Sequence, residues 1–205
     1  MAPPPPLRLH IGSGEVRLEG WLNVDLQPLP GVDIVADVTE GLRFSDVEAI
    51  YAEHFLEHLP LDDAVDFLLE CHRALKEGGW IRLSTPNLDW VWATHYRLSQ
   101  DPKEKFVSAL VLNRAFYGWC HQFLWNKEFL EEVLLACGYR EIRWCRYGES
   151  DLAVFRGIEH HRTYEDAPDL PHVLVVEAQK GPAQKKRLTE LRSVLRRQFL
   201  DQRTL

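Results

Sequence analysis

Short apolar runs alternate with turn residues through the first third of the chain, a pattern typical of β-strands. Four such runs, separated by prolines and glycines, predict strands over residues 7–11, 21–26, 32–38 and 48–53. The first run ends directly in Gly12-Ser13-Gly14, which indicates a turn. This part of the chain is therefore expected to consist of strands and turns.

The period of the apolar residues changes at Leu61, after which they recur at helical spacing. Acidic residues in the opening turns and basic residues near the end suit the helix macrodipole, and Gly78 suits a helix stop. A fifth strand is expected next, over residues 80–84. Beyond it we expect an aromatic-rich helical stretch, a helix capped by Asn126 and two closing strands, over residues 90–125, 126–136, 139–147 and 171–179.

Strands that alternate with helices predict an α/β fold, a Rossmann-like and mostly parallel sheet of about seven strands with helices on both faces. The first crossover is unusual, because only residues 15–20 separate Gly14 from Trp21. A parallel crossover normally requires a dozen residues or more. The first crossover helix is therefore expected to be shortened or lost.

The composition is that of an ordinary globular protein, since 45% of the 205 residues are hydrophobic and 27% are charged. No apolar run approaches the ~18 residues of a membrane span, and the proline run at the start does not resemble a signal peptide. The four cysteines form no C-x-x-C pair, which disfavours a disulfide framework or a cysteine zinc site. These features favour a reducing, cytoplasmic setting.

Charge divides the chain into a body and a tail. Residues 1–182 carry a net charge of −12, whereas residues 183–205 carry +5. An acidic body argues against nucleic-acid binding, which depends on cationic groups that neutralise phosphates. We expect one domain over residues 1–182 and a basic amphipathic helix over residues 183–205. That helix either docks on its own domain, forms a homodimer or lies on an anionic membrane surface, although its apolar stripe is narrow for a membrane.

Candidate chemistry concentrates before the first long helix. Glycines after the first strand allow a ligand to approach the backbone closely. Asp25 closes the second expected strand, where a rigid carboxylate can accept both hydroxyls of a ribose. Asp37 closes the third strand and suits an adenine amino group, and residues 53–58 close the fourth. This ordered set predicts a nucleoside-type ligand at the carboxyl edge of the sheet.

The chain resembles the class I (Rossmann-like) S-adenosylmethionine-dependent methyltransferases, especially small stand-alone members of the methyltransferase type 11 kind. The segments that carry the resemblance are LHIGSG, GWLNVDL, DIVADV, AEHFLEHL and LLECHRALKEGGWIRLSTPN. The resemblance implies S-adenosyl-L-methionine as the cofactor and methyl transfer to a small-molecule acceptor. It also implies the residues around the cofactor: Gly12, Ser13 and Gly14 beside the methionine part, Asp25 at the ribose, Asp37 and Val38 at the adenine, and Glu53 and His54 facing the sulfonium and the acceptor.

Relatives of this kind often accompany surface-polysaccharide assembly, so the resemblance points to a sugar or glycan precursor as the acceptor. The short first crossover and the missing third glycine leave an alternative, a non-catalytic methyltransferase-like binding or assembly module. A nicotinamide-dependent oxidoreductase is disfavoured, because Arg17 stands where the G-x-G-x-x-G fingerprint requires a glycine.

Residues 54–58 match the H-x-x-E-H pattern of inverted zincins, in which two histidines on one helix share a metal ion. Pro60 lies where that helix should continue, so we expect no metal. His54 and His58 are instead candidates for an acceptor-side catalytic role in a polar pocket wall, or they only pack or cap. Further candidates for an acceptor-side base are His95, His121, His160 and His161.

Aromatic residues are dense between the fifth strand and the capped helix. They either line an acceptor pocket, form a lid or belong to the core. The members of this group are Trp90, Trp92, Tyr96, Tyr117, Trp119, Phe123 and Trp125.

Overall fold

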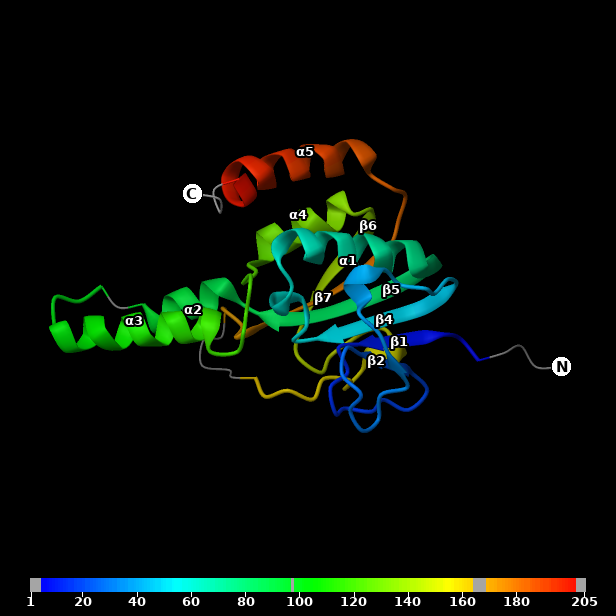
Figure 1. The fold of residues 1–205 in the computed structure, drawn as a ribbon, viewed down its shortest axis with the longest axis horizontal. Helices are drawn as coiled ribbons and strands as arrows, with labels where there is room; N and C mark the ends of the chain where they lie inside the picture. Colours follow the sequence, from blue (N-terminus) through cyan, green and yellow to red (C-terminus); the bar gives the residue numbers. More distant parts are fainter. Residues whose placement is uncertain (1–4, 97, 164–168, 202–205) are drawn as a thin grey trace.

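The computed structural model describes residues 5–96, 98–163 and 169–201. Its centre is a seven-stranded sheet of order β3-β2-β1-β4-β5-β7-β6 (Figure 1). Strands β1 to β5 run parallel to one another, and β7 runs antiparallel to both β5 and β6. The strands are β1 (Arg8–Ile11), β2 (Leu22–Asp25), β3 (Ile34–Val35), β4 (Val47–Glu53), β5 (Leu75–Pro86), β6 (Tyr139–Cys145) and β7 (Val173–Lys180). The predicted mostly parallel, Rossmann-like sheet is confirmed.

The helices largely follow the predicted order. They are α1 (Leu61–Ala74), α2 (Leu88–His95), α3 (Pro102–Tyr117), α4 (Lys127–Ala136) and α5 (Lys185–Leu195), with the short helical turns η1 (Val38–Glu40), η2 (Leu56–His58), η3 (Ala153–Phe155) and η4 (Arg196–Leu200). Asn126 caps α4 as expected, because its side chain accepts a hydrogen bond from the Phe129 amide at 3.1 Å. Gly78 does not stop α1, since Leu75 already has extended backbone and pairs with Val47 of β4.

The first crossover contains no helix, as predicted. β1 and β2 are parallel neighbours with Leu9 opposite Leu22, yet residues 12–21 between them form only turns. The crossover from β2 to β3 is also short and is interrupted by prolines. Neither connection can therefore lay a helix across the sheet.

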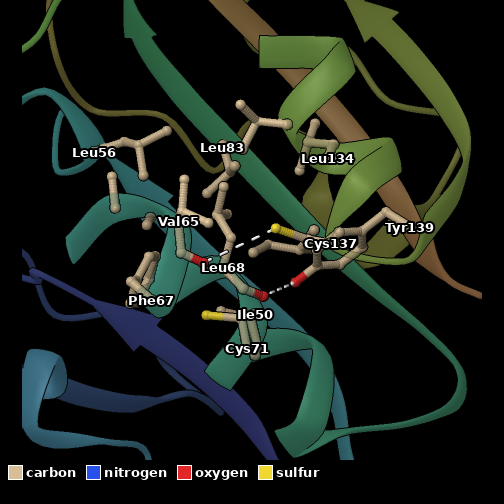
Figure 2. Packing of buried hydrophobic residues seen from close by; sticks show 14 of the residues in the cluster. Ile50, Leu56, Val65, Phe67, Leu68, Cys71, Leu83, Leu134, Cys137 and Tyr139 are labelled. Carbon is tan, nitrogen blue, oxygen red and sulfur yellow. Dashed lines mark hydrogen bonds between the residues drawn. The ribbon is translucent and has the colours of Figure 1, made fainter. Parts of the chain in front are cut away.

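One face of the sheet packs against α1, α4 and α5 (Figure 1). Phe67, Leu68 and Cys71 of α1 are buried among strand residues such as Ile50 (Figure 2). The Tyr139 hydroxyl donates to the Leu68 carbonyl at 2.9 Å, which joins β6 to α1 (Figure 2). This face is an almost entirely apolar core.

The basic tail helix α5 docks on its own domain. Leu191 and Leu195 are buried in the same core as α1 and α4. Arg187 forms two hydrogen bonds with the Glu132 carboxylate of α4, at 2.9 and 2.5 Å. None of the helices in residues 5–96, 98–163 and 169–201 has the length and apolar character needed to cross a bilayer.

The opposite face of the sheet is covered without an α-helix in the described part of the chain. Residues 146–163, which we call the cover segment, place Phe155 and Ile158 against Ala49 and Tyr51 of β4. Trp21 of the first crossover joins this second core, with its ring centroid 6.1 Å from that of Phe155. The α-helices expected on both faces thus pack on one, because the connections that would carry the others are too short.

A buried ion-pair network fixes the cover segment to the sheet. Arg82 of β5 lies between Glu177 of β7 and Glu159 of the cover segment, and its guanidinium nitrogens are 2.5 Å from a carboxylate oxygen of each. All three side chains are essentially inaccessible to solvent. Ser150 adds a hydrogen bond of 2.6 Å to Glu177. The irregular segment is therefore held by charge where a helix would be held by apolar contact.

Helices α2 and α3 pack on each other and extend sideways from the sheet (Figure 1). Some of the aromatic residues between the fifth strand and the capped helix are buried, and others are exposed. Trp90 and Trp125 are buried, as the core interpretation predicts, whereas the exposed members are Trp92, Tyr96, Tyr117 and Trp119.

Candidate functional site

The turn after β1 provides the first wall of the candidate site. Gly12 and Gly14 both have left-handed backbone, with φ of 63° and 54°. A Cβ on Gly12 would lie 2.5 Å from the Phe55 ring, so packing requires glycine there. A Cβ on Gly14 would meet no atom within 4 Å, so the space in front of Gly14 is open. Ser13 is buried between them, and its amide donates to the Val24 carbonyl at 3.2 Å.

Asp25 ends β2 beside this turn, as predicted. Its Oδ2 accepts a hydrogen bond from the Gly14 amide at 2.8 Å, and its Oδ1 accepts from the Gln27 amide at 2.9 Å. The second bond is the local turn contact that aspartates commonly make. A carboxylate has about four acceptor positions, so hydrogen-bonding capacity remains on this half-buried side chain.

Asp37 lies after β3 and is exposed. Its Oδ1 caps η1 by accepting from the Thr39 hydroxyl at 2.6 Å and the Thr39 amide at 2.9 Å, and these bonds lower the pKa of Asp37. Asp37 and Val38 line a cleft of about 540 Å³ whose other walls include Ile34 and Phe44. The structure thus places both residues beside a hollow with apolar walls.

Glu53 ends β4 but does not present a free carboxylate. It accepts hydrogen bonds from the Tyr147 hydroxyl at 2.9 Å and from the amides of His160 and His161, and it pairs with the His161 ring at 3.2 Å. Burial alone would raise the pKa of Glu53, but these donors lower it to about 2. In return, the bond to Glu53 raises the pKa of His161. Glu53 therefore anchors the cover segment at the edge of the site.

His54 follows with left-handed backbone, φ 46°, which turns its side chain at the strand end. Its Nδ1 lies 3.0 Å from a carboxylate oxygen of Glu57, and its ring centroid lies 4.7 Å from that of His161. Glu57 is fully buried, and its other oxygen accepts from the Thr85 hydroxyl at 3.0 Å. The carboxyl ends of β4 and β5 are therefore joined through Glu57.

His58 points to a different neighbour, His121 from the loop after α3. The two ring centroids lie 5.1 Å apart in an edge-to-face arrangement. Burial lowers the pKa of His121, and its Nδ1 lies 2.7 Å from the Ala115 carbonyl oxygen. His54 and His58 thus do not form the shared pair that the H-x-x-E-H pattern describes.

Of the remaining histidine candidates, His121 and His161 come to this site and His95 does not. His95 contacts Thr94 and Trp90 on α2 and lines a separate cavity between α2 and α3. His160 contributes its backbone amide to Glu53. Sequence reasoning did not identify Tyr147 and Thr85, although Thr85 stands in the T-P-N ending of the β5 motif.

Comparisons with known proteins bear on the fold and on the class of protein. Residues 10–83 match the model of a family described as "Methyltransferase domain". A S-adenosylmethionine-dependent methyltransferase from Archaeoglobus fulgidus superposes with a TM-score of 0.53 at 16% identity, over 85% of this chain and 86% of that one. One from Mesorhizobium loti superposes with a TM-score of 0.52 at 15% identity, over 88% and 94%. No curated protein sequence matches the chain.

At such low identities the superpositions show the fold, which agrees with the family match over β1 to β5. The lost first crossover helix leaves the strand order unchanged. The match of residues 10–83 to a methyltransferase domain and the shared α/β fold together support a class I, Rossmann-like S-adenosylmethionine-dependent methyltransferase.

Proposed function

We propose that the chain binds S-adenosylmethionine at the ends of β1 to β4 and transfers its methyl group to a polar small-molecule acceptor. The observation that carries the proposal is the Gly14–Asp25 hydrogen bond. It holds the turn after β1 against the strand-end carboxylate, although the helix that usually follows such a turn is missing. The binding edge is thus formed without that helix.

The residues present fit the cofactor at three points. The open space at Gly14 allows close approach to the backbone, and Asp25 has acceptor capacity for ribose hydroxyls. The cleft beside Asp37 and Val38 has a volume within the range of small-molecule pockets and suits an adenine ring. When bound, S-adenosylmethionine supplies a methyl carbon on a sulfonium.

The acceptor side supports a hydroxyl-rich substrate, and we propose a sugar or glycan precursor. His54, His58, His121 and His161 gather there around the buried Glu57, so hydrogen-bonding groups dominate. Exposed Trp119 lies beside His121, with ring centroids 6.0 Å apart. Methyl transfer depends mainly on alignment of nucleophile, carbon and sulfur, so these side chains would act first by orienting the acceptor.

Asp25→Asn tests the cofactor site. The amide keeps the shape and the turn but loses the charge-assisted acceptor, a loss of about 1.5–3 kcal/mol in binding. We expect S-adenosylmethionine affinity to fall at least about tenfold by titration calorimetry, with little change in melting temperature. The matched control is Asp46→Asn, an exposed aspartate at the amino end of β4 whose φ of 59° asparagine also tolerates.

Equal affinity of Asp25→Asn and the wild type would remove Asp25 from the site. The non-catalytic alternative makes a different prediction, because a binding or assembly module would transfer no methyl group. Incubation with radiolabelled S-adenosylmethionine and a panel of sugar and nucleotide-sugar acceptors separates the two. Label transferred to a sugar supports the enzyme, whereas cofactor binding with no transfer to any acceptor in the panel favours the assembly module.

A further inference from the structure

Three side chains with metal-ligand atoms meet at the acceptor side of the site. One carboxylate oxygen of Glu57 and one ring nitrogen each of His58 and His121 all lie within 4.8 Å of one another. Glu57 and His58 belong to η2, whereas His121 follows α3. The amides of Gln122 and Phe123 donate to the Glu57 carbonyl at 2.7 and 3.2 Å. These backbone bonds hold the two distant segments in register.

Hydrogen bonds outside the cluster orient two of its members. The Ala115 carbonyl can only accept, so Nδ1 of His121 carries the proton and Nε2 keeps its lone pair. The Glu57 carboxylate is fixed between His54 and Thr85, each at 3.0 Å. Outer hydrogen bonds of this kind are what metal-binding histidines and carboxylates normally have.

The charge of Glu57 gives a second, independent reason to expect a cation. Its side chain is fully buried, and a buried carboxylate is costly unless a positive group compensates it. Within residues 5–96, 98–163 and 169–201, no lysine or arginine forms an ion pair with Glu57, whose carboxylate contacts the His54 ring and the Thr85 hydroxyl. Two other buried carboxylates have such partners, since Glu177 pairs with Arg82 and Glu53 pairs with the His161 ring and accepts from backbone amides.

We propose that Glu57, His58 and His121 bind a divalent transition-metal ion of the zinc type. Two imidazoles and one carboxylate suit such ions, and three protein ligands leave a position open for water or an acceptor oxygen. A metal there would polarise an acceptor hydroxyl. This proposal departs from the expectation of a metal-free protein, and it differs from an inverted-zincin site, in which His54 and His58 would share the ion.

The test uses the untagged full-length chain, stripped with a chelator and titrated with Co²⁺ and Zn²⁺ by absorbance and calorimetry. We expect one equivalent of Co²⁺ to bind with visible d–d bands that Zn²⁺ removes. His58→Gln and His121→Gln should each weaken Co²⁺ binding more than about 100-fold, beyond the loss typical of an outer hydrogen-bond partner. His54→Gln should weaken it about 10–100-fold, because it only releases Glu57.

The control is His72→Gln, which removes a histidine of α1 that bonds to Gly181 instead. It should keep one equivalent of Co²⁺ at wild-type affinity. Melting temperatures of the metal-free variants show that each one folds. No Co²⁺ binding by the wild type, or equal binding by the His58→Gln/His121→Gln double variant, would overturn the site. Cofactor affinity measured on metal-free protein tests the proposed function separately.

Discussion

The two faces of the sheet are covered in opposite ways. On one face, α1, α4 and α5 bury an apolar core in which Leu68 and Leu134 are inaccessible to solvent. On the other, the irregular cover segment packs a small aromatic core around Phe155 and is fixed by Arg82 with its two carboxylates. The difference follows from two short crossovers, which leave the second face without α-helices in the described residues.

The comparison shows which face of the sheet connects the stability of the fold to the candidate site. The helical face meets the candidate site at the cleft beside Asp37, because Val38 belongs to the same core as Leu68. The cover segment, by contrast, runs from the buried ion pairs to Glu53 and ends beside His54 through His161. Perturbations of the second face should therefore reach the candidate site at His54, whereas a perturbation of the helical core at Leu68 should not.

The largest effect is expected from Arg82→Leu. It leaves Glu159 and Glu177 buried without a cation, which typically costs about 3–5 kcal/mol. Urea unfolding should show this loss, and hydrogen exchange should show an opened cover segment. Arg140→Leu, at an exposed position of β6, should change stability by less than about 0.5 kcal/mol. A loss below about 1 kcal/mol in Arg82→Leu would mean that charge does not hold this face.

Leu68→Ala perturbs the core on the helical face instead. Removing this fully buried side chain should cost about 2–5 kcal/mol of unfolding free energy, through lost burial and the cavity left behind. At temperatures where the variant is folded, affinity for S-adenosylmethionine should equal that of the wild type. Impaired affinity in the folded variant would contradict the separation of the two faces.

Glu53→Gln tests, through the pH dependence of the unfolding free energy, whether charge anchors the cover segment. The folded-state pKa of about 2 lies below the ordinary 4.5, so the stabilisation is present above pH 4.5 and is lost as pH falls toward 2. A shift of this size corresponds to about 3 kcal/mol. The unfolding free energy of the wild type should fall more steeply than that of Glu53→Gln over this interval. Parallel profiles would show that Glu53 does not anchor the cover segment by charge.

The contribution of His161 to stability should have the opposite pH dependence. Its pKa is raised by Glu53, so its contribution is present below pH 6.5 and is lost as pH rises through the raised value. The half-exposed ring makes this contribution small. It should disappear from the pH profile of Glu53→Gln.

The smallest effect is expected from Arg187→Gln, which breaks the pair between α5 and α4. Both side chains are at least 40% exposed, so the loss should stay below about 1 kcal/mol. Leu195→Ala, at a buried position of the same helix, should cost more. The reverse order, seen by thermal unfolding, would mean that charge rather than apolar packing docks the tail.

Much of the fold was predictable because its signals are local. Apolar periods locate β1, β4 and α1, and a count of residues between Gly14 and Trp21 predicts the lost helix. The strand-end position of Asp25 followed in the same way. The cover segment was not predictable, because its apolar residues have no regular period. The residues that it contacts in β4 and β5 are also far from it in the sequence.

The same limit applies to the site. Position at the end of β4 suggests that Glu53 faces the cofactor, but amides of residues 160 and 161 occupy its carboxylate. The pattern in residues 54–58 suggests a pairing of His54 with His58, whereas the tertiary structure gives each a different partner, His161 and His121. Both outcomes depend on contacts between distant segments, which a local pattern does not record.

The cover segment also has a consequence for the order in which the chain folds. Ala49, Tyr51 and Trp21 lie in the N-terminal third, but Phe155 and Ile158, which bury them, are synthesised about a hundred residues later. Until then, β1 and β4 have one face exposed to water in the growing chain. Non-local closure of this kind slows folding and lengthens exposure to aggregation. The second face of the sheet is therefore covered only after the cover segment has been synthesised, long after β1 to β4.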